Sequence, residues 1–431
     1  MRTLLNNISI IPVAGTTQII EKGFIVIEDN IIADMGSGEA ETAGYDLVID
    51  GENQVVLPGF INTHTHAAMT LLRSYADDLP LMEWLETKIW PLEDRLTAED
   101  IYWGTMLAIV EMIKSGTTTF ADMYFYMDEV AKAVESSGMR ACLSRGMVGI
   151  GPQSEQAITD SIDLVNKWHN QGEGRITVML GPHAPYTCPP EYLQKVAELA
   201  HKLKVGVHIH VAETSGEVAD TVRKYGKTPV ELLKDAGLFE NHVLAAHCVH
   251  LSENDIAILA ESGAGIAHNP ESNMKLASGI APVPQLLAAG IPVALGTDGA
   301  SSNNNLDMLQ EMRTCALLHK VNSMDPTVLP AYKALEMATV NGAQALGLGN
   351  KIGRLQKGYK ADMIIIDLEA AHQIPRYDIV ANLVYAGQAS DVDTVIIDGK
   401  IVMKNRQIKT LNEAEVFKMA KKIAARLMTQ V

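Results

Sequence analysis

The chain has 431 residues, of which 47% are hydrophobic, so it can bury the core of one large domain and an accessory domain. Its formal net charge of −17 disfavours nucleic acid as a partner, because a phosphate backbone requires a basic surface. The sequence has no apolar run of about 18 residues and its start does not resemble a signal peptide, so we expect a cytoplasmic protein without a membrane partner.

Residues 1–57 are typical of short β-strands joined by turns. The segment GFIVIEDNIIADMG (23–36) has two apolar runs on either side of Asp29 and Asn30, a turn pair that predicts a hairpin. The segment LVIDGENQVVLPG (47–59) repeats the pattern with Gly51 at its turn. We therefore expect this part of the chain to form β-structure without helices.

From residue 58 onward, apolar strand segments alternate with helical stretches. The helix expected over 97–116 begins with Thr97 and Asp100 in capping-box spacing and ends at Gly116. Eight strand–helix units favour a closed parallel barrel, and continuous apolar strands suit a sheet that is buried on both faces. The eight predicted strands lie in residues 59–66, 117–122, 140–145, 176–183, 205–213, 242–248, 264–270 and 292–299.

Strand patterns return after residue 352, in the segments 358–368 and 391–405, and a last helix is expected at about 412–428. The two ends of the chain therefore combine in one β domain. We predict an α/β fold: a distorted (β/α)8 TIM barrel formed by residues 58–352, with a small β-sandwich domain formed by residues 1–57 and 353–431.

Polar side chains gather at the ends of the predicted barrel strands. His64 and His66 point to the same side of their strand, because residues i and i+2 share a face. The ends of parallel barrel strands meet at one mouth, where active sites lie, and burying so many polar groups there without partners is costly. The other strand-end residues are His183, His208, His210, Glu213, His247, His268 and Asp298. Their concentration predicts an active site.

The remaining histidines have simpler interpretations. His208 lies two residues before His210 and is expected to pack behind the site. His268 is followed by Asn269 and Pro270, and its role stays open between the site and a loop contact. Six histidines in helical or loop segments are expected to face solvent: His169, His201, His242, His250, His319 and His372.

Four of the strand-end residues make a metal-ligand set: His64, His66, His210 and Asp298. Three imidazoles and one carboxylate suit a single divalent ion, either zinc or ferrous iron. Such a metal lowers the pKa of a bound water and yields a hydroxide that attacks an sp2 carbon. Asp298 would take the proton, Glu213 would carry a proton to a ring nitrogen of the substrate, and His247 would orient the hydroxide. We predict metal-assisted hydrolysis.

The motifs PGFINTHTH, HVAET, HCVH and GTDG resemble those of the amidohydrolase superfamily. The segments 71–93, 115–124, 181–188 and 269–283 resemble its 5-methylthioadenosine/S-adenosylhomocysteine deaminases, and the likeness covers nearly the whole chain. The resemblance implies a hydrolase that acts on the C–N bonds of cyclic amidines. It would convert 5-methylthioadenosine, S-adenosylhomocysteine, 5′-deoxyadenosine or adenosine to the inosine analogue and ammonia. Relatives also suggest a homo-oligomer, either a dimer or a tetramer.

The resemblance assigns roles to individual residues. The four proposed ligands match the metal ligands of the family, Glu213 matches the residue that handles the adenine N1 proton, and His247 matches the residue beside the metal-bound water. Glu93 matches a carboxylate that holds the ribose hydroxyls, and His183 matches a histidine that contacts substrate. Arg145 matches an arginine near the 5′ substituent. Trp84 is expected to form an apolar wall over the base or the thioether.

Two absences refine these expectations. Some relatives carry a second arginine in the loop after Arg145, where it helps to bind the homocysteine carboxylate, whereas residues 146–157 here contain no Arg or Lys. Because a buried carboxylate requires such partners, we expect substrates without that carboxylate to compete well. Binuclear relatives use a carboxylated lysine that the strand 176–183 lacks, so we expect one metal.

Two alternatives remain. Another mononuclear amidohydrolase, such as a guanine or cytosine deaminase or a triazine hydrolase, would share the metal ligands. Glu213 favours deamination over the triazine reaction, and Glu93 favours a nucleoside over a free base. A non-catalytic metal-binding barrel protein is disfavoured, because ligands, proton carrier and pocket residues are all present.

Overall fold

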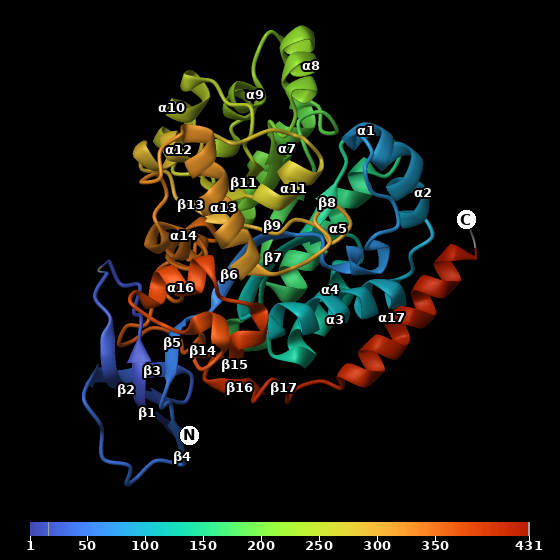
Figure 1. Cartoon of the computed structure of the whole chain (residues 1–431). Helices are drawn as coiled ribbons and strands as arrows, with labels where there is room; N and C mark the ends of the chain where they lie inside the picture. The colour runs from blue at the N-terminus through green and yellow to red at the C-terminus, as the bar shows by residue number, and fades with distance from the viewer. Residues whose placement is uncertain (16, 430–431) are drawn as a thin grey trace.

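The computed structural model describes residues 1–15 and 17–429, and its centre is an eight-stranded parallel sheet that forms a nearly closed barrel (Figure 1). The hydrogen-bonded order is β13-β12-β11-β10-β9-β8-β7-β6, so consecutive strands are neighbours. The strands are β6 (Phe60–Thr65), β7 (Thr117–Tyr124), β8 (Arg140–Met147), β9 (Ile176–Pro182), β10 (Val207–Val211), β11 (Val243–His247), β12 (Gly265–His268) and β13 (Val293–Leu295).

Hydrogen bonds between β6 and the end of β13 bring the first and last barrel strands together. Thr63 Oγ1 donates to the Leu295 carbonyl (2.9 Å), the Thr297 amide to Asn62 Oδ1 (3.0 Å) and the Asp298 amide to the His64 carbonyl (2.9 Å). Gly296 permits this approach, because a Cβ there would lie 2.8 Å from the His64 backbone nitrogen. The closure therefore places Asp298 beside His64 of β6 and His66, which directly follows the strand.

Helices alternate with the strands of the barrel, and further helices follow its last strand. The helix α3 has the predicted capping box: Asp100 Oδ2 accepts from the Thr97 amide (2.8 Å), and Thr97 Oγ1 accepts from the Asp100 amide (3.3 Å). The helices are α1 (Leu81–Trp84), α2 (Trp90–Glu93), α3 (Ala98–Lys114), α4 (Met127–Ser137), α5 (Ser154–Trp168), α6 (Gln171–Gly174), α7 (Pro190–Leu203), α8 (Ser215–Tyr225), α9 (Pro229–Asp235), α10 (Glu253–Ser262), α11 (Pro270–Lys275), α12 (Val283–Ala288), α13 (Met308–Ser323), α14 (Ala331–Met337), α15 (Val340–Ala345), α16 (Ile379–Tyr385) and α17 (Glu413–Met428). Within the described residues, none of them is long and apolar enough to span a membrane.

A second, mixed sheet contains strands from both ends of the chain. Eight of its strands have the order β17-β16-β15-β14-β5-β1-β2-β3, and β4 pairs with β1. The junction is the antiparallel pairing of β5 with β14. The strands are β1 (Arg2–Ile10), β2 (Ile20–Glu28), β3 (Ile31–Ser37), β4 (Leu47–Asp50), β5 (Gln54–Pro58), β14 (Met363–Asp367), β15 (Val392–Ile397), β16 (Lys400–Lys404) and β17 (Gln407–Ile408). The predicted barrel with a β domain from both chain ends is confirmed.

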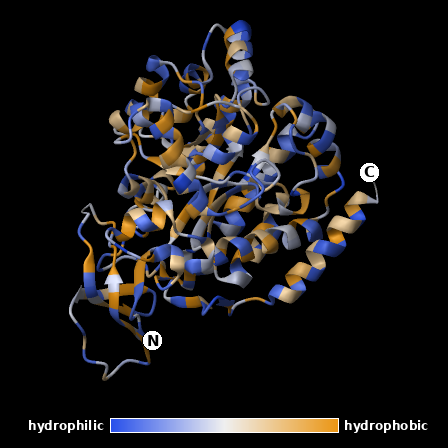
Figure 2. Cartoon of the chain, viewed as in Figure 1, coloured by the Kyte–Doolittle hydropathy of each residue, from blue (hydrophilic) through white to orange (hydrophobic). Residues whose placement is uncertain are grey.

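The apolar residues divide between the barrel and the β domain. The β-domain sheet has its own buried cluster, which includes Leu5, Ile25, Val56 and Ile365. Figure 2 shows the strands of this domain mainly in hydrophobic colours, whereas the outlying helix α8 is largely hydrophilic. The terminal helix α17 packs against α3 of the barrel. Hydrophobic burial therefore stabilises both parts of the molecule.

A buried ion pair connects the barrel to the β domain. Arg140, at the start of β8, donates to both oxygens of Asp362 (2.6 and 3.1 Å) and to Asp398 Oδ1 (3.2 Å). The three side chains are 4%, 2% and 1% exposed. A buried charge that loses its partner destabilises a fold strongly, so this contact is important for holding the two parts together.

We expect Arg140→Met to lower the free energy of unfolding by about 3 kcal/mol, because it leaves two buried carboxylates without their main cation. Urea denaturation of the wild type and the variant measures the difference. Lys132→Met is the control, because Lys132 pairs with Glu129 on the surface, where its side chain is 50% exposed. This substitution should lower the free energy of unfolding by less than about 1 kcal/mol. Equal stability of the two variants would contradict a structural role for Arg140.

Candidate metal centre and active site

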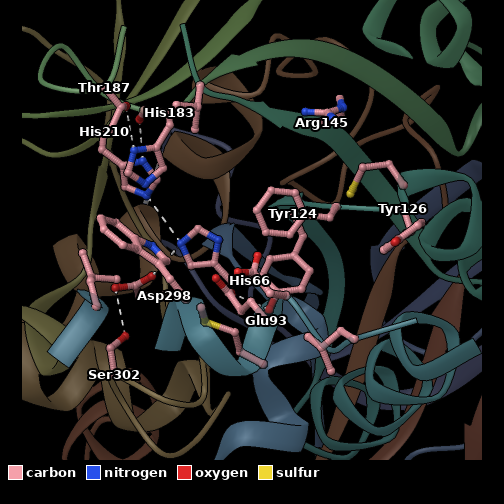
Figure 3. Close-up of a pocket in the computed structure, with 18 of the residues that line it drawn as sticks. His66, Glu93, Tyr124, Tyr126, Arg145, His183, Thr187, His210, Asp298 and Ser302 are labelled. Atoms are coloured by element: carbon pink, nitrogen blue, oxygen red, sulfur yellow. Dashed lines mark hydrogen bonds and ion pairs between the residues drawn. The ribbon is translucent and has the colours of Figure 1, made fainter. Parts of the chain in front are cut away.

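The strand ends of β6 and β10 and the segment after β13 bring four potential ligands into one cluster, and Figure 3 shows His66, His210 and Asp298 among them. Asp298 Oδ1 lies 3.5 Å from His64 Nε2 and 3.2 Å from His66 Nε2, and His210 Nε2 lies 3.4 Å from His66 Nε2. His64 Nε2 is buried without a hydrogen-bond partner among the described residues. A buried imidazole nitrogen of this kind requires a partner, so the cluster fits a divalent metal ion.

The other ring nitrogen of each histidine is already held. His64 Nδ1 lies 2.8 Å from His208 Nε2, His66 Nδ1 lies 2.6 Å from the Met123 carbonyl and His210 Nδ1 lies 2.7 Å from the His183 carbonyl. Such contacts fix the ring and leave the opposite nitrogen free for a metal. His208 therefore packs behind the cluster, as expected from the sequence.

Asp298 is fixed as an anion at the edge of this cluster. Its Oδ2 accepts hydrogen bonds from Ser272 Oγ (2.6 Å) and Ser302 Oγ (3.0 Å), and its Oδ1 accepts from the Gly299 amide (2.8 Å). Burial alone would raise the pKa of Asp298, but the close approach of the His64 and His66 rings outweighs it and holds the pKa well below its usual value. The carboxylate is therefore ionised over the whole neutral range.

The histidines differ in charge. Burial lowers the pKa of His64 to about 4 and that of His210 well below its ordinary value, so both are neutral near pH 7, as metal ligands must be. Burial also opposes charge on His66, but Asp298 outweighs it and raises the pKa of His66 to about 9. Metal binding would therefore compete with one proton on this ring.

Two further groups face the cluster from neighbouring strands. His247 Nε2 lies 3.9 Å from Glu213 Oε2 and 4.0 Å from Asp298 Oδ2, and its Nδ1 lies 2.9 Å from Asn273 Oδ1. Burial raises the pKa of the Glu213 carboxyl. Glu217 accepts from the Glu213 amide (2.8 Å) and so fixes the backbone there. A carboxyl whose pKa is raised above its usual value suits general acid chemistry.

A cavity of about 890 Å³ extends from this cluster to the protein surface. All six predicted substrate-binding residues line it: Trp84, Glu93, Arg145, His183, Glu213 and Asp298. Tyr124 Oη donates to Glu93 Oε1 (2.6 Å), and burial raises the pKa of Glu93. Figure 3 shows Arg145 on the far side of Tyr124 from His210 and Asp298. The predicted residues therefore follow one another along a single cavity.

A second group of metal-binding residue types lies away from this cavity, formed by His268, Cys315 and His319. His319 is fully buried, so its predicted solvent exposure is wrong, because its ring on α13 lies against His268 at the end of β12. His268 Nε2 and His319 Nε2 lie 3.2 Å apart, but the Nδ1 atoms of both rings have no partner among the described residues. This group lacks the supporting contacts of the first cluster.

A barrel whose strand ends hold such a cluster is characteristic of metal-dependent hydrolases. The chain belongs to the amidohydrolase family, whose model matches residues 55–402. A protein of Syntrophomonas wolfei named 5-methylthioadenosine/S-adenosylhomocysteine deaminase is 68% identical over 429 residues, which cover 99% of this chain and 100% of that protein.

Solved structures agree with this membership. An adenosine deaminase from Xanthomonas campestris, solved with bound zinc, matches with a TM-score of 0.95 and 34% identity, and the match covers 99% of this chain and 98% of that one. An atrazine chlorohydrolase from Arthrobacter aurescens in complex with zinc has a TM-score of 0.91 at 24% identity, over 98% and 100% of the two chains. The second likeness concerns the fold alone.

The sequence interpretation missed several polar partners of the site. Tyr124 ends β7, so the rule that polar strand-end residues face the mouth could have found it. Asn273 and Ser272 lie on α11, and Glu217 lies in the first turn of α8. No spacing in the sequence identifies these contacts, because they depend on how each helix packs over the strand ends.

We expect His208→Leu to weaken metal affinity about 10- to 100-fold, because His64 loses the partner that orients its ring. Competition with a chromophoric chelator measures the affinity. The control is His201→Leu on the exposed side of α7, which should leave the affinity unchanged. An unchanged affinity in the His208 variant would rule out this supporting role.

Proposed function

We propose that the protein is a metal-dependent hydrolase that deaminates the adenine ring of 5′-substituted adenosines and releases the inosine analogue and ammonia. The observation that carries the proposal is the buried proton carrier Glu213 beside the cluster of His66, His210 and Asp298, in a cavity that continues past Glu93. The name of the Syntrophomonas wolfei relative supports the same substrate class.

The ligands in this proposal are His64, His66, His210 and Asp298, which would hold one zinc ion, with ferrous iron as the alternative. Three nitrogens and one oxygen suit zinc, and the Xanthomonas campestris structure contains zinc. A divalent ion held there would supply Lewis-acid activation of a water molecule.

The remaining chemistry is proton transfer by residues of the chain. Asp298 accepts a proton from the water that adds to adenine C6, while Glu213 delivers a proton to adenine N1. Asp298 then returns its proton to the amino group, the C6–N bond breaks, and ammonia leaves. The proton of the new hydroxyl at C6 returns to Glu213, which restores the starting state. His247 orients the attacking water between the two carboxyl groups.

Glu93 accounts for a nucleoside rather than a free base. Tyr124 occupies one carboxylate oxygen of Glu93, so the second oxygen is available to accept from the ribose hydroxyls. Trp84 would then form an apolar wall over the base or the thioether, and His183, held by Thr187 through a 3.0 Å contact at Nδ1, would contact the substrate. Guanine deamination, cytosine deamination and triazine hydrolysis do not explain Glu93, because their substrates have no ribose. A non-catalytic barrel does not explain Glu213, because it transfers no proton.

Three further expectations belong to the same proposal. We propose the cytoplasm as the location, since Cys142, Cys188, Cys248 and Cys315 are all free and buried, which suits a reducing compartment. The homo-oligomer, either a dimer or a tetramer, stays a prediction. The domain boundaries, with residues 58–352 as the barrel and residues 1–57 and 353–431 as the β domain, also stay a prediction.

Asp298→Asn should reduce ammonia release from 5-methylthioadenosine by at least about 1,000-fold, because it removes the group that accepts the proton of the attacking water. The assay uses zinc-loaded protein, and metal content is measured in parallel to separate loss of chemistry from loss of metal. The control Asp220→Asn changes a carboxylate that is 67% exposed and should retain full activity. Full activity of the Asp298 variant would disprove the mechanism.

Glu93→Gln should reduce kcat/KM for 5-methylthioadenosine about 10- to 100-fold, mainly through KM, because a hydrogen bond to a charged acceptor becomes a neutral one. Steady-state kinetics gives both constants. Glu86→Gln, on an exposed position of the same segment, is the matched control. A fall in kcat at constant KM would instead place Glu93 in the chemical step.

A further inference from the structure

Arg145 is held by its own chain at the outer end of the cavity. Its Nε and Nη2 both lie 3.2 Å from Asp160 Oδ2, and its Nη1 donates to the Gly146 carbonyl. Asp160 is itself fixed on α5, because its Oδ1 accepts from Gln156 Nε2 (2.8 Å). The guanidinium charge is therefore already paired before any ligand arrives.

The surroundings of this pair are apolar and acidic. Phe125, Val148 and Ile150 line this end of the cavity with side chains that are 38%, 38% and 57% exposed. Asp163 follows Asp160 by one turn of α5 and also lines the cavity. Among the described lining residues, Arg145 carries the only permanent positive charge. An apolar group is therefore accommodated here more readily than an anion.

We propose that Asp160 determines specificity at the 5′ end of the substrate, an inference that rests on the proposed function. A 5′ substituent that ends in a carboxylate must displace Asp160 from Arg145, and the displaced carboxylate then lies next to another negative charge. A methyl thioether leaves the ion pair intact and packs on the apolar residues. Asp160 thereby selects 5-methylthioadenosine over S-adenosylhomocysteine.

The test compares kcat/KM for 5-methylthioadenosine and S-adenosylhomocysteine in zinc-loaded wild type and variants. Asp160→Asn keeps the side-chain shape and removes the charge, so the preference for the methyl thioether should fall about fivefold, the effect of one partly exposed ion pair. Asp160→Ser is a second variant in case the amide perturbs the loop, and melting temperatures check the fold of each protein.

Two controls make the result specific. Asp163→Asn removes an equal charge from the same helix without touching Arg145, and should change the preference less than about twofold. In an Arg145→Met background, Asp160→Asn should change the preference less than in the wild type, because no ion pair remains to be displaced.

Each outcome has one interpretation. A shift in the Asp160 variants alone, which becomes smaller in the Arg145→Met background, supports the proposal. Equal shifts in the Asp160 and Asp163 variants assign the effect to overall charge and overturn it, as does an unchanged preference in the Asp160 variants of an active enzyme. A wild type that deaminates neither nucleoside refutes the proposed function itself, and this inference with it.

Discussion

The closure of the barrel between β6 and the end of β13 is the constraint on which the site depends. The Asp298 amide donates to the His64 carbonyl, so the backbone itself sets the distance between the carboxylate and the two histidines at the end of β6. Side-chain flexibility then has little influence on the cluster, because each ring and each carboxylate oxygen is also held by a second contact. A site built on strand ends in this way is rigid before any ligand binds.

Rigidity at the cluster contrasts with the varied lining farther out. Near Asp298 the groups are buried, charged and mutually bonded, which suits chemistry that needs fixed proton donors and acceptors. Past Tyr124 the lining changes to partly exposed apolar side chains around one paired arginine. In the proposed function, the cavity separates two tasks along its length: transformation of the ring at the inner end and discrimination among substituents at the outer end.

Most of the fold and the central residues of the site could be predicted from the sequence. Eight apolar segments defined the barrel, and the histidines and acids after them shared one mouth, because parallel strands leave no other geometry for their ends. Burial on α13 could not be predicted in the same way. Leu317 and Val321 of this helix are 51% and 65% exposed, whereas His319 is fully buried. Hydropathy would predict Leu317 and Val321 to be buried and His319 to be exposed. The observed burial is determined by how α13 packs in the tertiary structure.

The pairing of β5 with β14 has a consequence for the nascent chain. The two strands are separated by about 300 residues, so at ~5–20 residues per second β5 waits on the order of 15 to 60 s for its neighbour to leave the ribosome. During that interval β5 presents an open edge, which is a place where strands of other chains can add. The β domain is thus completed only after the barrel has been synthesised, although strands β1 to β5 are made before the barrel.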